Sequence, residues 1–141
     1  MMLKELELDI KRLSHVSINS DDLDRAEIFY KEILGLKIVH KFINDKGERY
    51  GFFLLSGGGT FIEIFRSKNT VTRQGCLRHL CFEVADIEKC SAELRSKGIN
   101  DFEIKRGRTD RVLQLFIDGP DGVQIEFQQH DELSLLFEYV K

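Results

Sequence analysis

The chain has 141 residues, a hydrophobic share of 42% that includes eleven Phe, and a formal charge of −3. This length suits one domain or two small modules with a shared core. Both signs of charge are spread along the sequence without a basic stripe, which argues against a nucleic-acid partner, and no apolar run is long enough to span a membrane. Three cysteines without CxxC spacing argue against a disulfide framework, so we expect a reducing, cytoplasmic environment.

The first half of the sequence predicts a strand, a helix and three further strands. Residues 1–11 lack the continuous apolar stretch of a secretory signal and are treated as an N-terminal extension. Apolar and polar residues alternate over His15–Asn19, as is typical of a half-buried strand. Asp21 or Asp22 can cap the following helix, and Gly35 suits its end. Three strands separated by turn residues are then predicted at Lys37–Asn44, Tyr50–Ser56 and Thr60–Arg66.

The second half of the sequence repeats this order. Residues 13–35 (LSHVSINSDDLDRAEIFYKEILG) align with residues 77–98 (LRHLCFEVADIEKCSAELRSKG). The two strand histidines match at an offset of 64 residues, whereas the glycines that end the helices match at 63. One residue is therefore lost in the second helix or at its end.

The strands of the second unit also match those of the first. The segment FIEIF of the first unit aligns loosely with VQIEF of the second, so Glu63 corresponds to Glu126. Asp86 is the candidate cap of the second helix and Gly98 its end. The remaining strands are predicted at Phe102–Arg106, Val112–Asp118 and Val123–Gln128.

These elements predict an α+β fold of two tandem βαβββ modules. Because one helix covers only one face of each sheet, the two sheets can meet in a concave, mixed β-sheet trough. The chain then divides into the N-terminal extension, two modules, a polar linker and a tail that could form a short amphipathic helix. The extension is 1–11, the first module is 12–67, the linker is 68–76, the second module is 77–129, and the tail is 130–141.

Four polar side chains are predicted on the sheet faces that the helices leave uncovered: His15, Glu63, His79 and Glu126. A carboxylate in the middle of an apolar strand is costly unless something compensates it, and this cost arises at matching positions of both units. A metal ion compensates two carboxylates and also binds two imidazoles. We therefore expect one divalent metal ion per site (Ni, Co, Zn, Mn or Fe), with positions left for water or substrate oxygens.

Side chains on the same faces are candidates for the wall of a small-molecule pocket. They flank the two glutamates along their strands or lie on a neighbouring strand, and one of them, Cys81, is equally compatible with an inert buried thiol. The candidates are Phe61, Phe65, Cys81, Gln114, Phe116, Gln124 and Gln128.

Two sequence runs resemble the vicinal oxygen chelate superfamily, over roughly Leu13–Gln129: FYKEILGL at Phe29–Leu36 and DGPDGVQIEF at Asp118–Phe127. The superfamily includes glyoxalase I, methylmalonyl-CoA epimerase, extradiol dioxygenases, fosfomycin-resistance thiol transferases and bleomycin-binding proteins. The resemblance implies a substrate that chelates the metal through two adjacent oxygens. Its ligand pattern falls on the four residues His15, Glu63, His79 and Glu126.

The complete ligand set is most similar to that of glyoxalase I. This resemblance implies a metal-dependent lyase or isomerase that moves a proton next to a carbonyl, with Glu126 as base and Glu63 as its symmetric counterpart. Extradiol dioxygenase or thiol-transferase chemistry, or a non-catalytic small-molecule binding or resistance protein, are the alternatives. A homodimer is expected, and the sequence leaves open whether the modules pair within one chain or exchange between two.

Overall fold

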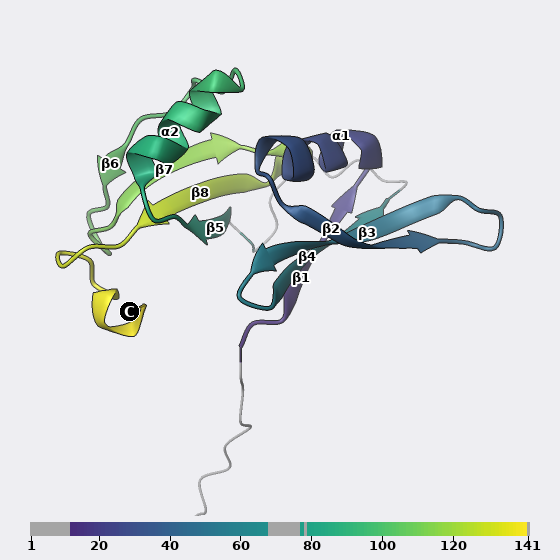
Figure 1. Ribbon diagram of the computed structural model, residues 1–141, viewed down its shortest axis with the longest axis horizontal. Helices are drawn as coiled ribbons and strands as arrows, with labels where there is room; N and C mark the ends of the chain where they lie inside the picture. Colours follow the sequence, from purple (N-terminus) through teal and green to yellow (C-terminus); the bar gives the residue numbers. More distant parts are fainter. Residues whose placement is uncertain (1–11, 68–76, 78, 141) are drawn as a thin grey trace, which may run out of the picture.

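The computed structural model describes residues 12–67, 77 and 79–140. These residues form two modules, each with a four-stranded mixed sheet and helical segments on one face (Figure 1). The predicted α+β fold of two tandem βαβββ modules with mixed sheets is confirmed. The proposed extension at 1–11 and linker at 68–76 lie outside the described residues.

The first module has the strand order β1-β4-β3-β2, with β1 parallel to β4 and the other pairs antiparallel. The Asp22 carboxylate accepts a hydrogen bond from the Arg25 amide at 3.0 Å and so caps the helix, as predicted. Three strands follow the helix close to the predicted positions. The elements are β1 (His15–Ser20), α1 (Leu23–Glu27), η1 (Ile28–Ile33), β2 (Lys37–Ile43), β3 (Arg49–Gly57) and β4 (Thr60–Arg66).

The helix of the first module widens where the sequence predicted a regular α-helix. Segment η1 is a π-helix, and its last turn is closed by the Leu34 amide, which donates to the Phe29 carbonyl at 3.0 Å. A π-helical turn holds one more residue than an α-helical turn. This insertion accounts for the residue by which the first helix exceeds the second in the alignment of the two units.

The second module has the corresponding order β5-β8-β7-β6. The strand predicted at Phe102–Arg106 is reduced to its last two residues, and Phe102 and Ile104, which precede them, pack against the core. The predicted tail helix is a single 3-10 turn. The elements are β5 (His79–Glu83), α2 (Ile87–Ser96), β6 (Lys105–Arg106), β7 (Leu113–Asp118), η2 (Pro120–Gly122), β8 (Gln124–Gln129) and η3 (Phe137–Tyr139).

Arg106 holds the tail against the second module. Its guanidinium donates to both carboxylate oxygens of Asp131, at 3.0 and 2.7 Å. This hydrogen bonding is the main reason why the pKa of Asp131 falls to about 2. The Leu135 amide adds a hydrogen bond to the Asp110 carbonyl at 2.8 Å. The tail therefore packs beside the loop between β6 and β7.

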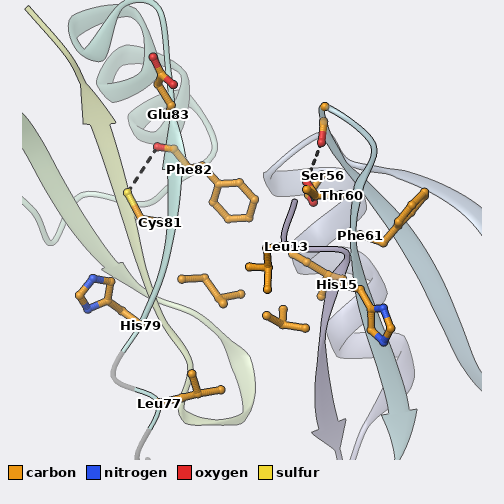
Figure 2. A pocket seen from close by; sticks show the side chains of 15 residues that line it. Leu13, His15, Ser56, Thr60, Phe61, Leu77, His79, Cys81, Phe82 and Glu83 are labelled. Carbon is orange, nitrogen blue, oxygen red and sulfur yellow. Dashed lines mark hydrogen bonds between the residues drawn. The ribbon is translucent and has the colours of Figure 1, made fainter. Parts of the chain in front are cut away.

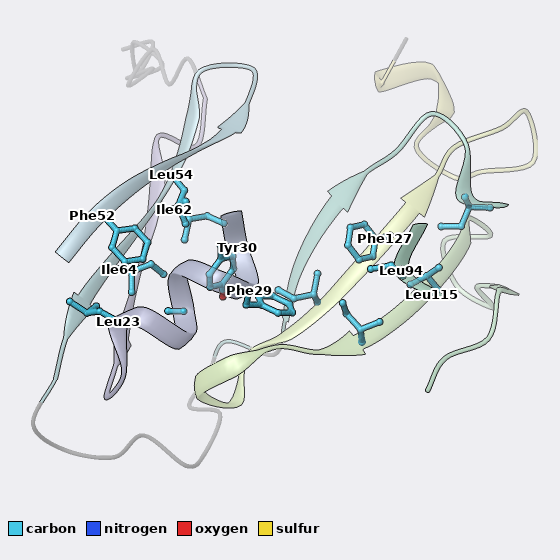
Figure 3. Packing of buried hydrophobic residues seen from close by; sticks show 14 residues of the cluster. Leu23, Phe29, Tyr30, Phe52, Leu54, Ile62, Ile64, Leu94, Leu115 and Phe127 are labelled. Atoms are coloured by element: carbon cyan, nitrogen blue, oxygen red, sulfur yellow. The ribbon is translucent and has the colours of Figure 1, made fainter. Parts of the chain in front are cut away.

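The helical segment of the first module also packs on the second module. Figure 3 shows Phe29 and Tyr30 between the two sheets. A Cβ atom at Gly119, in the turn between β7 and β8, would lie 2.8 Å from the Val123 carbonyl oxygen and 3.3 Å from the Phe29 ring, so glycine there allows both the turn and the approach of Phe29. Beside this contact, Arg25 pairs with Asp121 at 2.9 Å. The modules therefore meet through the helical layer, away from the open sheet faces.

We expect Arg25→Ala to destabilise the fold, because it leaves the Asp121 carboxylate, whose side chain is only 5% exposed, without its cationic partner. Because an unpaired buried charge is unfavourable, the variant should lower the free energy of unfolding, measured in urea, by roughly 1–3 kcal/mol. The control Lys105→Ala removes an ion pair with Glu103 in which both side chains are exposed, and should cost less than about 0.5 kcal/mol. Equal effects of the two variants would contradict the role given to Arg25.

Candidate functional site

The two predicted His–Glu pairs occupy equivalent positions on the two sheets. On the first sheet Ser17, two residues after His15, lies beside Glu63 in the parallel ladder. On the second sheet Cys81, two residues after His79, lies beside Glu126 in the same way. Each histidine is therefore diagonal to its glutamate across two hydrogen-bonded strands. We call each such His–Glu pair a half-site.

The alternation of the strands places both half-sites on open faces. The neighbours of Glu63 along β4, Ile62 and Ile64, are buried in the core, and so are the neighbours of Glu126, Ile125 and Phe127. Since successive strand residues point to opposite faces, both glutamates point away from the helices. Both glutamates therefore lie on the sheet face that the sequence pattern predicted, the one that the helices leave uncovered.

The half-site of the second sheet is held by a hydrogen-bonded network around Glu126. His79 Nε2 lies 3.0 Å from Glu126 Oε2, and Gln128 Nε2 donates to Glu126 Oε1 at 3.0 Å. The Glu126 side chain is only 4% exposed, so both oxygens of a nearly buried carboxylate have partners. Gln128 also reaches Asp110 at 3.4 Å, and the His79 ring meets Phe116 edge to face at 5.5 Å.

The half-site of the first sheet is more open and has aromatic neighbours. His15 is exposed, its Nδ1 atom lies 3.3 Å from the Ser14 hydroxyl, and its ring meets Phe53 edge to face at 5.8 Å. Glu63 is half-buried beside Phe53 in the ladder between β3 and β4. The equivalent positions thus carry the same two ligand types in different surroundings.

The four predicted ligands do not come together in one chain. Figure 2 shows His15 and His79 on opposite sides of an apolar hollow, with each ring turned away from it. The hollow has a volume of about 660 Å³, and its lining includes Val16, Ile62 and Leu80 from the core-facing sides of the strands. Among residues 12–67, 77 and 79–140, no three His, Cys, Asp or Glu side chains are close enough to hold a metal ion.

The other predicted site residues divide between the two half-sites. Phe61 and Phe65 flank Glu63 on the first sheet. The rest surround Glu126 on the second sheet: Cys81, Gln114, Phe116, Gln124 and Gln128. Two neighbours were missed by the sequence reasoning. Asp110 lies in a loop without periodicity, and Phe53 could have been found from its alternation with buried Phe52 and Leu54.

The fold and the pairs together define a duplicated α+β scaffold with one His–Glu pair on each open sheet face. The family model for the Glyoxalase/Bleomycin resistance protein/Dioxygenase superfamily matches residues 12–127. The chain belongs to this superfamily.

Three relatives illustrate the range of similarity. Human mitochondrial methylmalonyl-CoA epimerase is 29% identical over 136 residues, which cover 86% of this chain and 75% of that protein. Lactoylglutathione lyase of Schizosaccharomyces pombe is 26% identical over 159 residues, which cover 93% of this chain and 51% of that protein. The crystal structure of SMU.1112c superimposes with a TM-score of 0.71 at 28% identity, covering 85% of this chain and 99% of that one.

In the described part of the chain, no helix combines the length and apolar character needed to cross a membrane.

Cys81 is a protonated thiol in this setting. Restricted solvation of its Sγ atom, together with the charge of Glu126 and a hydrogen bond to it, raises the pKa of the thiol to about 12. Because the thiolate is the reactive form of cysteine, Cys81 is chemically quiet at neutral pH although the residue is exposed.

In metal-free protein kept in EDTA, we expect Cys81 to react with iodoacetamide at pH 8 at least roughly tenfold more slowly than free cysteine. Glu126→Gln removes the neighbouring charge and should accelerate the reaction, followed by mass spectrometry of the Cys81 peptide. Cys90 is the internal control: burial is the main reason its pKa is raised, and Glu126 does not contribute. An unchanged rate at Cys81 in the variant would show that Glu126 does not govern the thiol.

Proposed function

We propose that the chain is a metal-dependent lyase or isomerase of the glyoxalase I type, which transfers a proton next to a carbonyl of a small, oxygen-rich substrate. The observation that carries the proposal is the pair of half-sites in identical strand register, one of them with its imidazole and carboxylate 3.0 Å apart. Similarity to a lactoylglutathione lyase and to methylmalonyl-CoA epimerases supports this class of activity.

The donor set fits a divalent metal ion of the transition series. Two imidazole nitrogens and two carboxylate oxygens, without thiolate, suit Ni, Co, Zn, Mn or Fe(II) with positions left for substrate. When bound, such an ion would supply Lewis-acid polarisation of the substrate carbonyl. His15, Glu63, His79 and Glu126 are the residues that we propose to hold it.

Glu126 is the proposed base. Its Oε1 atom accepts a hydrogen bond from Gln128, and its Oε2 atom faces His79 Nε2 at 3.0 Å. Oε2 would take a proton from the substrate carbon when the His79 ring holds the metal ion instead. Glu63 occupies the equivalent position on the other sheet and can return the proton from the opposite side. Gln128 thus has a positioning role, since it orients the carboxylate that reacts.

We propose that a second copy of the chain completes each site. In the described strands, β1 pairs only with β4 and β5 only with β8, so each sheet has a free edge next to its half-site histidine. Leu13 and Leu77, which precede these edges, are exposed. Unpaired edges flanked by apolar residues favour association. A two-fold dimer can bring the His15–Glu63 pair of one copy to the His79–Glu126 pair of the other, twice.

Mixing two inactive variants tests the shared site. We expect His15→Ala and His79→Ala to lose high-affinity Ni²⁺ or Zn²⁺ binding, measured by calorimetry and elemental analysis, while His40→Ala, outside the half-sites, retains it. When the two variants are refolded together, mixed dimers should recover one intact site each, because one copy supplies His15 and the other supplies His79. Metal binding that does not recover on mixing would place the site within one chain. No metal binding by the unaltered protein would favour a metal-free binding protein.

A second variant tests the base. Glu126→Gln should lower turnover by roughly 10²–10⁴-fold, the usual contribution of a general base, while the thermal unfolding temperature changes little. The substrate is first sought by screening 2-oxoaldehydes, beginning with methylglyoxal and glutathione, and acyl thioesters. Cys81→Ser, beside Glu126 but without a proposed proton-transfer role, is the matched control. Turnover that survives in Glu126→Gln would refute the assignment.

A further inference from the structure

The open face of the first sheet carries a continuous group of aromatic rings, here called the aromatic face. Ring centroids lie 5.3 Å apart for Phe42 and Phe53, 5.2 Å for Phe42 and Phe65, and 6.0 Å for Phe53 and Phe61. Tyr50 stacks on Phe65 at 6.2 Å. All these rings come from β2, β3 and β4, and none of them belongs to the buried core.

The backbone makes room for this surface. Gly51 lies beside Phe65 in the ladder, and a Cβ atom at Gly51 would lie 2.6 Å from the Phe65 ring. The ring therefore lies across the strand at a position where any larger residue would displace it. A patch of adjoining aromatic side chains outside the core is the kind of surface that marks a ligand-binding groove or an interface.

The duplication provides an internal comparison. Glu63 is flanked along its strand by Phe61 and Phe65, whereas Glu126 is flanked by Gln124 and Gln128. Gln114 adds a third amide beside Gln128 on the second sheet. Gln128 holds the Glu126 carboxylate, but the shared fold and register do not by themselves require rings at the matching positions of the first sheet. Phe116 on the second sheet matches Phe53 and contacts His79 as Phe53 contacts His15. The difference therefore lies in the positions that flank the glutamates along their strands, with rings beside Glu63 and amides beside Glu126.

The aromatic face is continuous with the proposed metal ligands of the first sheet. Phe61 lies beside His15 in the ladder, and Phe53 contacts the His15 ring at 5.8 Å. A molecule whose oxygens reach His15 and Glu63 therefore places its next atoms against these rings. A charged group there would lose hydration without gaining partners, whereas a flat, uncharged group can stack.

We propose, on the basis of the function proposed above, that the substrate has two parts. A planar, uncharged apolar group, of the size of a phenyl ring or larger, packs on the aromatic face. An adjoining oxygen-rich head binds at the half-site ligands and accepts or donates hydrogen bonds with the glutamines of the second sheet. Phe53 and Phe61 determine specificity for the apolar part.

Two chelators with the same head test the proposal. Benzohydroxamate and acetohydroxamate both present two adjacent oxygens and differ only in phenyl against methyl. We expect the metal-loaded protein to bind benzohydroxamate roughly tenfold more tightly, measured by calorimetry. Phe61→Leu and Phe53→Leu should remove most of this preference and leave the affinity for acetohydroxamate unchanged. Phe102→Leu, which alters a ring that packs on Arg95 outside the aromatic face, should retain the preference.

A second probe separates this inference from the metal chemistry. Uncharged, planar 2-naphthol should bind metal-free protein, followed by its fluorescence, and Phe61→Leu should weaken that binding. If the hydroxamates fail to bind but 2-naphthol binds through Phe61, the proposed metal-dependent function is wrong and the aromatic subsite stands. Equal affinity for the two hydroxamates, or 2-naphthol binding that is indifferent to Phe61→Leu, would overturn the inference. Thermal unfolding of each variant verifies that it is folded.

Discussion

The helical segment α1–η1 packs on both modules at once, and the placement of the half-sites depends on this packing. Phe29 and Tyr30 lie between the sheets, next to the glycine turn that joins β7 and β8. Because the modules meet through their helix-covered sides, the open faces of the two sheets remain on the outside. The same contact that builds one core from two small modules therefore separates the His15–Glu63 pair from the His79–Glu126 pair within a single chain (Figures 1 and 3).

Features that depend on neighbouring residues in the sequence could be predicted, whereas features that depend on contacts between distant residues could not. Strand alternation is a local property, so the sequence was sufficient to place His15, Glu63, His79 and Glu126 on the open faces. The one-residue difference between the repeats indicated that the two helices differ in length. It did not indicate that the first helix contains a π-helical turn. The orientation of the modules depends on a long-range contact of Phe29 with Gly119, and neither residue carries a periodic signal for it. This is why the sequence left open whether the four ligands meet within one chain or between two chains.

The two half-sites illustrate how a buried charge and an exposed one are stabilised differently. Glu126 is almost excluded from water, and its carboxylate needs both His79 and Gln128 to offset the loss of hydration. Glu63 is half-buried among rings and retains more contact with solvent. A site assembled from both would therefore combine one preorganised carboxylate with one that is free to adjust. That difference suits the distinct roles proposed above for the two glutamates, as base and as counterpart.

Duplication and divergence act on different sides of the same strands. The core-facing residues of β4 and β8, such as Ile62 and Ile125, stay apolar because each must pack beneath a helix. The ligand positions keep the same register. Among the remaining open-face positions, one keeps a phenylalanine in both modules, Phe53 and Phe116. The positions that flank the glutamates differ, with phenylalanines on the first sheet and glutamines on the second. Gln128 also holds Glu126, but neither the shared fold nor the shared register requires phenylalanines beside Glu63. The substrate proposed above, apolar at one end and polar at the other, accounts for this contrast.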